Sequence, residues 1–149
     1  CENTSYSYTD SRVYNICTIS PVSPIESNKW IVKKGKELIS KAAFGKYTDG
    51  KYALTVDIDD EIRVDRKPMI KRDRSSGIFG GSIRKKDGYT LDITNISDKT
   101  KSLKLIERIP SSTTDKIESK LISIKGDTSH KIRKNGQLDI SVTLKPNEH

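Results

Sequence analysis

The chain has 149 residues, of which 32% are hydrophobic, and its 28 Lys and Arg against 20 Asp and Glu give a net charge of +8. This length predicts one domain that buries roughly 68–70% of its unfolded surface around a single core. No apolar run approaches the roughly 18 residues of a membrane-spanning helix, and two cysteines are too few for a disulfide scaffold, so both classes are excluded.

The charge is unevenly distributed along the chain. Glu2, Asp10 and Glu26 against Arg12 give residues 1–28 a net charge of −2, so the remainder carries +10. A basic surface favours anionic partners, namely nucleic acid, acidic lipid headgroups or acidic polysaccharide. A lysine-rich surface that only keeps the protein dissolved explains the charge equally well.

The two cysteines, Cys1 and Cys17, leave three states open. They could form a disulfide in an oxidising compartment, or Cys17 could be a free, buried thiol. Cys1 is also a candidate for the lipid-anchored first residue of a bacterial lipoprotein, which would bring a membrane contact. In each case we expect residues 1–10, which are polar, to form a flexible tether.

The first elements follow the tether. Val13–Ile19 predicts a strand, which ends before the prolines at 21 and 24. A short apolar run covers Trp30–Val32. The next segment, Lys36–Phe44, fits either an amphipathic helix or the second arm of a hairpin that turns at Lys34-Gly35.

Residues 52–64 carry the clearest alternation in the first half of the chain. Their apolar side chains fall on even positions and their opposite face is charged, which predicts one long strand or two collinear strands. The acidic group Asp57–Glu61 does not match a calcium loop, because Ile62 and Pro68 stand where glycine and glutamate are required. We therefore predict a solvated strand face, with no metal and no cofactor.

The second half of the chain continues the strand pattern. Gly88–Pro110 predicts a β-hairpin with a turn at Asn95–Thr100, and Ile117–Ile124 is strand-like without a consistent face. Asn135-Gly136 predicts a tight turn before the alternating Leu138–Leu144. Several short strands separated by turns predict an all-β fold, specifically an antiparallel β-sandwich of the immunoglobulin-like kind.

Catalytic motifs are missing from the sequence. The only histidines are His130 and His149, no serine lies in a G-x-S-x-G turn, and no phosphate-binding glycine loop occurs. We predict that the protein is not an enzyme.

Residues 69–88, MIKRDRSSGIFGGSIRKKDG, are basic and rich in glycine, and we call them the basic loop. This loop is the candidate partner-binding site. Its predicted tip carries two apolar residues, Ile78 and Phe79, between glycines and flanked by cations. Such a tip would suit a protein partner or an anionic envelope component. The alternative is that Ile78 and Phe79 fold back over the edge of the sandwich. A lone Phe79 argues against single-stranded nucleic acid, which requires several stacking aromatics. The candidate residues are Arg72, Arg74, Gly77, Ile78, Phe79, Gly80, Gly81, Arg84 and Lys85.

Three stretches carry a resemblance to a known family: TVDIDDEIRVDRK, then SSGIFGGSIRKKDGYTLDITNISDKTKSLKLIERIPSSTTDKIESKLISI, then KNGQLDISVTLKPNE. Their order and spacing resemble the C-terminal domain of unknown function of bacterial mucoidy inhibitor A-like proteins, over roughly residues 29–148. The resemblance implies a β-sandwich in a periplasmic, cell-envelope or secreted protein without assigned catalytic residues. It also implies a hairpin turning on a glycine at VKKGKELISKAAF, and a further strand after His149.

The sequence therefore predicts two segments, residues 1–28 with the polar tether and first strand, and residues 29–149 with the sandwich. The first functional hypothesis is a non-enzymatic interaction or structural module of a bacterial cell-envelope or exported protein. The second is a binder of an anionic ligand, meaning polysaccharide, lipid headgroup or nucleic acid, through the basic loop.

Overall fold

The computed structural model describes residues 1–23, 25, 29–43, 47–69, 73–75, 84–110, 118–126 and 128–149. Within these residues all regular structure is β, so the all-β prediction is confirmed. None of the described segments forms a helix that could cross a membrane. The strands are β1 (Glu2–Ser5), β2 (Val13–Ile19), β3 (Lys29–Lys34), β4 (Glu37–Ala43), β5 (Tyr52–Ile58), β6 (Ile62–Pro68), β7 (Asp73–Ser75), β8 (Arg84–Lys86), β9 (Tyr89–Asn95), β10 (Lys101–Arg108), β11 (Ser129–Ile132) and β12 (Gln137–Leu144).

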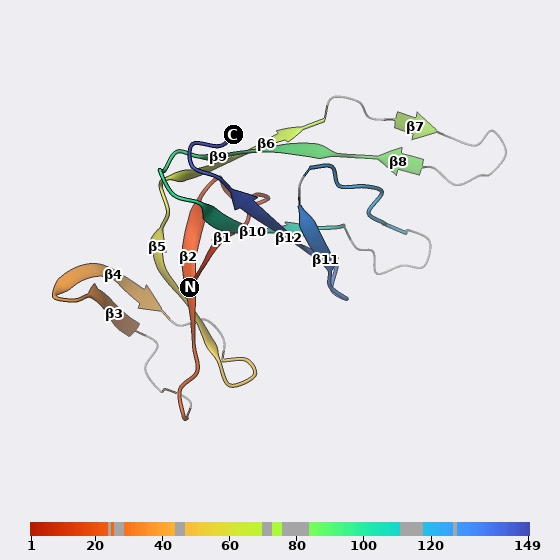
Figure 1. Cartoon of the computed structure of the whole chain (residues 1–149). Helices are drawn as coiled ribbons and strands as arrows, with labels where there is room; N and C mark the ends of the chain where they lie inside the picture. The colour runs from red at the N-terminus through yellow and green to blue at the C-terminus, as the bar shows by residue number, and fades with distance from the viewer. Residues whose placement is uncertain are drawn as a thin grey trace.

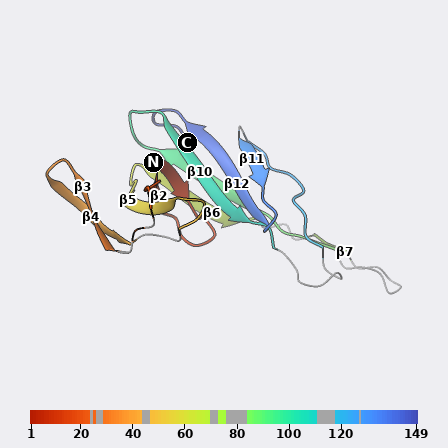
Figure 2. The same cartoon turned by 90° about the horizontal axis from the view of Figure 1, so that it is seen from below.

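Six of these strands form one sheet, in the order β11-β12-β10-β1-β2-β5, and the other six form three two-stranded ribbons, β3-β4, β6-β9 and β7-β8 (Figure 1). Within the large sheet β1 and β10 run parallel, while the other neighbours run antiparallel. The sheets remain open, and the β7-β8 ribbon lies beyond the ends of the other strands in both views (Figures 1 and 2).

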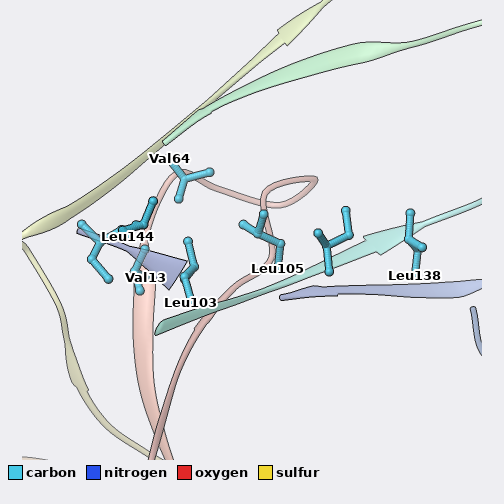
Figure 3. Packing of buried hydrophobic residues seen from close by; sticks show 8 residues of the cluster. Val13, Val64, Leu103, Leu105, Leu138 and Leu144 are labelled. Atoms are coloured by element: carbon cyan, nitrogen blue, oxygen red, sulfur yellow. The ribbon is translucent and has the colours of Figure 1, made fainter. Parts of the chain in front are cut away.

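The core forms where the β6-β9 ribbon packs across one face of the six-stranded sheet. Val64 of β6 faces the row of leucines from β10 and β12 (Figure 3). Burying each such aliphatic side chain contributes about 1.5–3 kcal/mol, so this contact between layers is the main stabilising interaction of the described fold. The buried cluster consists of Val13, Ile62, Val64, Leu103, Leu105, Leu138, Ile140 and Leu144.

The predicted hairpin over Gly88–Pro110 is wrong, although both of its strands are present. β9 pairs with β6, whereas β10 pairs with β1 and β12. Leu91 and Ile93 of β9 pack against the same core as Leu103 and Leu105 of β10. The connection therefore crosses from one layer to the other as an arch, and the apolar faces of the two strands meet without sharing a ladder.

Asn95 holds this arch together. Its side chain is fully buried, and its Nδ2 donates to the carbonyl of Lys99 at 2.7 Å and to that of Lys145 at 2.9 Å. Its Oδ1 accepts from the hydroxyl of Ser97 at 2.7 Å. The backbone N–H of Asn95 donates to the carbonyl of Glu148 at 2.8 Å. One amide side chain thus joins the arch to the end of β12.

The expected flexible tether over residues 1–10 is also wrong. Glu2–Ser5 form β1, which lies between β2 and β10 with Ser5 fully buried. In the antiparallel β1-β2 pair Glu2 is opposite Ile16, so one further step places Cys1 opposite Cys17. These two cysteines form a disulfide in the structure. The large sheet takes strands both from residues 1–28 and from residues 29–149.

Two turn predictions are confirmed. β3 and β4 pair around Gly35, whose φ of 63° suits glycine, so the hairpin replaces the alternative helix over Lys36–Phe44. β11 and β12 pair across the Asn135-Gly136 turn. By contrast, residues 118–126 contain no strand, and Ile122 is 67% exposed, which agrees with the inconsistent face of that pattern.

The even-position pattern of residues 52–64 divides between two layers. Tyr52 and Leu54 of β5 are buried in the large sheet, and Ile62 and Val64 of β6 are buried from the opposite ribbon. Ile58, at the end of β5, is 39% exposed. The alternation therefore marks two strands that belong to different sheets.

Replacing Asn95 with alanine should lower the free energy of unfolding by about 2–3 kcal/mol, because the partly buried carbonyls of Lys99 and Lys145 and the buried Ser97 hydroxyl lose their partner. Urea denaturation measures this loss. The control is Asn135→Ala: Asn135 is exposed, and its Oδ1 accepts a hydrogen bond from the Gln137 N–H. This variant should lose about 1 kcal/mol or less. Equal losses in the two variants would contradict the assigned role of Asn95.

Candidate functional site

The described part of the basic loop is the β7-β8 ribbon, which we call the basic arm. Asp73 pairs with Lys86, Arg74 with Lys85, and Ser75 with Arg84. Four of these six residues carry positive charges and one carries a negative charge. The arm continues the line of the β6-β9 ribbon and extends away from the six-stranded sheet (Figures 1 and 2).

The structure locates only some of the predicted binding residues. Arg74, Arg84 and Lys85 lie on the two strands of the arm, with Arg74 and Lys85 directly opposite each other. Arg72 and the segment Gly77, Ile78, Phe79, Gly80 and Gly81 lie outside the described residues. Whether Ile78 and Phe79 contact a partner or fold back therefore stays a prediction.

The base of the arm is closed by one backbone hydrogen bond, in which Met69 N donates to the carbonyl of Gly88 at 2.9 Å. Gly88 leaves little room here, since a Cβ on it would lie 2.7 Å from the Met69 Sδ. The two strands that lead into the arm therefore approach closely at this position.

Beneath this base lies a buried carboxylate that the sequence analysis missed. Glu107 of β10 is fully buried, and its Oε1 accepts a hydrogen bond from the Ser7 hydroxyl. Its Oε2 lies 3.9 Å from Arg66 Nε and has no hydrogen-bond partner among the described residues. We call Ser7, Arg66, Tyr89 and Glu107 the root cluster.

Within the root cluster, Arg66 of β6 contacts Tyr89 of β9 and so joins the two strands of the ribbon. Its guanidinium lies 3.9 Å from the centroid of the Tyr89 ring, which is a close cation–π contact. Burial, and after it the negative charge of Glu107, raises the pKa of Tyr89 to about 12. Tyr89 therefore keeps its proton at neutral pH. The sequence signal for the cluster was Glu107 itself, which is in phase with Leu103 and Leu105 on the apolar face of β10.

A second polar surface lies on the opposite face of the six-stranded sheet. The Tyr6 ring contacts those of Tyr8 and Tyr14, with centroids 6.4 and 6.5 Å apart. The Tyr14 hydroxyl donates to Asp10 at 2.7 Å, and this hydrogen bond lowers the pKa of Asp10. A shallow recess of about 270 Å³ adjoins these residues. This recess is too shallow to enclose a ligand, and tyrosine rings form part of its wall.

The acidic group between β5 and β6 is engaged with a lysine. Asp59 accepts from Lys101 Nζ at 2.7 Å, and Glu61 accepts from the same atom at 2.6 Å. Burial lowers the pKa of Lys101, but these hydrogen bonds outweigh it and raise the pKa overall. Among the described residues no three His, Cys, Asp or Glu side chains are placed to hold a metal ion.

Comparison with family models gives one match. The model of a family described as a domain of unknown function (DUF4139) matches residues 13–149. The match begins at the first residue of β2 and so leaves out β1. The comparisons with curated proteins and with solved structures gave no match.

The root cluster makes a prediction for Tyr89. With a pKa of about 12, roughly one tenth of Tyr89 should be ionised at pH 11. Glu107→Gln removes the negative charge and should increase that fraction, although burial keeps the pKa of Tyr89 above its ordinary value. NMR of tyrosine ring carbons, assigned with Tyr89→Phe, measures the ionised fraction.

The matched control is Glu118→Gln, which neutralises an exposed carboxylate. It should leave the titration of Tyr89 unchanged. If Glu107→Gln also leaves it unchanged, the two side chains do not interact as described.

Proposed function

We propose that this chain, which belongs to the family of the domain of unknown function DUF4139, is a non-enzymatic interaction or structural module. The basic arm is its contact site, and the open β-sheets are the scaffold that holds the arm. The observation that carries this proposal is the extension of the arm beyond the sheets on a ribbon whose base is fixed (Figure 1).

The anchoring of the arm supports this role. A two-stranded ribbon alone is marginally stable in water, so an extended arm needs a rigid base. Arg66 and Tyr89 supply it through their contact above the buried Glu107, and Ile62 and Val64 fix the same ribbon in the core. Loops and ribbons held in this way by a scaffold are common sites of partner binding.

The proposed setting is a bacterial cell-envelope or exported protein, located in the periplasm, in the envelope or outside the cell. The Cys1–Cys17 disulfide supports it, because disulfides persist in oxidising compartments. We also propose that the fold is a variant of the immunoglobulin-like β-sandwich, and that the chain is related to mucoidy inhibitor A-like proteins. The two-layered core and the family match support these finer assignments.

The second candidate function is binding of an anionic ligand through the same arm. Four cations among the six described arm residues favour it, because clustered positive charge attracts polysaccharide sulfates or carboxylates, lipid phosphates and nucleic acid alike. Salt dependence separates this candidate from the first.

The charge of the arm is tested by the triple variant R74S/R84S/K85S against the control K33S/K36S/K41S, which removes three exposed charges from the β3-β4 ribbon. If the arm is the contact site, only the first variant loses the partner captured from a bacterial envelope extract. The control sites are exposed, so the control variant should melt within about 0.5 kcal/mol of the unchanged protein. We expect the same of the arm variant if its charges serve partner binding. Equal capture by both variants would overturn the assignment.

I78S/F79S tests the apolar tip in the same assay. Loss of capture with unchanged melting indicates a contact site, whereas a large drop in melting temperature shows that these residues belong to the core. For the second candidate, binding to phosphatidylglycerol vesicles, dextran sulfate and a single-stranded oligonucleotide is titrated between about 50 and 200 mM salt. A steep loss of affinity supports the anionic ligand, and no salt dependence excludes it.

A further inference from the structure

The outer edge of β6 has no strand beside it among the described residues. β6 pairs with β9 along one edge, from Ile62 opposite Asn95 to Pro68 opposite Tyr89. Along its other edge runs a shallow groove of about 600 Å³, whose walls include Arg12 and Asp60. An open edge presents unpaired backbone N–H and C=O groups, so it is a template for another strand.

The register shows which backbone groups are directed toward this open edge. The Ile96 N–H donates to the Glu61 carbonyl, and the Met69 N–H donates to the Gly88 carbonyl. In an antiparallel ladder the hydrogen-bonded pairs alternate with non-hydrogen-bonded pairs. Arg63 and Asp65 therefore bond to β9. The N–H and C=O groups of Val64 and Arg66 and the carbonyl of Ile62 face the open edge, whereas the Ile62 N–H donates to the Asp59 carbonyl at 3.4 Å.

The exposed side chains of β6 alternate in charge. Arg63 and Asp65 are both exposed, one on each side of Val64. The described ion pair of Asp65 is a 3.4 Å contact with Lys67, and both of these side chains are more than half exposed. Such a surface pair is weak and leaves Asp65 available to another cation.

These charges are complementary to themselves when β6 meets a second copy in antiparallel register. A two-fold axis through Val64 places Arg63 opposite Asp65 of the second copy, and it does so twice because of the symmetry. Val64 then lies opposite its own equivalent as a hydrogen-bonded pair. Moving the axis by one residue, to Arg63 or to Asp65, places identical charges opposite each other, which is destabilising.

We propose that the open edge of β6 is a self-association surface, where two copies of this chain pair antiparallel about Val64 and join their β6-β9 ribbons into one four-stranded sheet. Charged side chains on edge strands usually prevent such pairing. Here the alternating charges of Arg63 and Asp65 instead favour a second copy in the register centred on Val64. An axis through Arg66 would pair Val64 with Pro68, which has no N–H to donate. The edge is short, so the dimer is weak and forms at high protein concentration.

Charge exchange at positions 63 and 65 tests the register. Sedimentation velocity over a concentration series up to about 1 mM should show a dimer of the unchanged protein. Arg63→Asp alone and Asp65→Arg alone each create two like-charge pairs, which should weaken the dimer roughly 10- to 30-fold. The double exchange R63D/D65R restores opposite charges and should restore dimerisation.

The matched controls are Lys36→Asp and Glu37→Arg, which make the same changes in net charge at exposed positions of the β3-β4 turn. They should leave the dimer intact, and circular dichroism should confirm that every variant keeps its fold. A monomer at all concentrations would overturn the proposal. A dimer that survives either single exchange, or that is not recovered by the double exchange, would also overturn it.

Cross-linking provides an independent measure of the same register. Residues 63 and 65 of two copies form a non-hydrogen-bonded pair, whose Cα atoms are about 4.5 Å apart and within disulfide range. Under copper-phenanthroline oxidation, a mixture of Arg63→Cys and Asp65→Cys proteins should form a covalent dimer much faster than either variant alone. Faster cross-linking within one variant would place the axis elsewhere and contradict the proposed pairing.

Discussion

The contact between the β6-β9 ribbon and the six-stranded sheet is the interaction on which the other features depend. Two strands alone cannot bury both of their faces, so the ribbon is stable only while Ile62 and Val64 pack against Leu103 and Leu105. The basic arm is an extension of that ribbon, and the open edge of β6 is its outer side. Both proposed contact surfaces therefore depend on the apolar contact that fixes the β6-β9 ribbon on the sheet.

Buried polar side chains define how the two layers are joined. Asn95 satisfies carbonyl groups at the crossing between layers, and Glu107 lies under the base of the arm beside Arg66. A buried polar group costs free energy unless it finds partners, so each of these residues favours one arrangement of the strands around it. The apolar core stabilises the contact between the layers but does not specify how the strands are connected. Asn95 and Glu107 favour the arch and the observed position of the ribbon.

Much of the strand content could be predicted from the sequence, but the pairing of strands could not. Alternation correctly marked Tyr52, Leu54, Ile62 and Val64 as buried, because alternation reports which face of a strand meets the core. It does not report the neighbouring strand, so a hairpin and an arch produce the same pattern over residues 89–108. Glycine turns were informative where a positive φ is needed, as at Gly35 and Gly136.

The root cluster could be predicted from the sequence to a smaller extent than the strands. Glu107 follows the apolar phase of β10, but its partners Ser7, Arg66 and Tyr89 come from three distant segments that only the fold brings together. β1 was missed because Glu2–Ser5 contains no apolar residue, and its place in the sheet is secured by backbone hydrogen bonds on both sides.

That placement of β1 also constrains the order in which the chain acquires structure. Asn3 is paired with Leu103, so completing the middle of the large sheet requires a contact between strands that are about one hundred residues apart in the sequence. Local pairs such as β3-β4 can form early in folding, whereas the pairing of β1 with β10 must first bring distant parts of the chain together and is therefore slower. Once formed, the disulfide between Cys1 and Cys17 keeps β1 beside β2 whether or not β10 has paired, which lowers the entropy cost of that distant pairing.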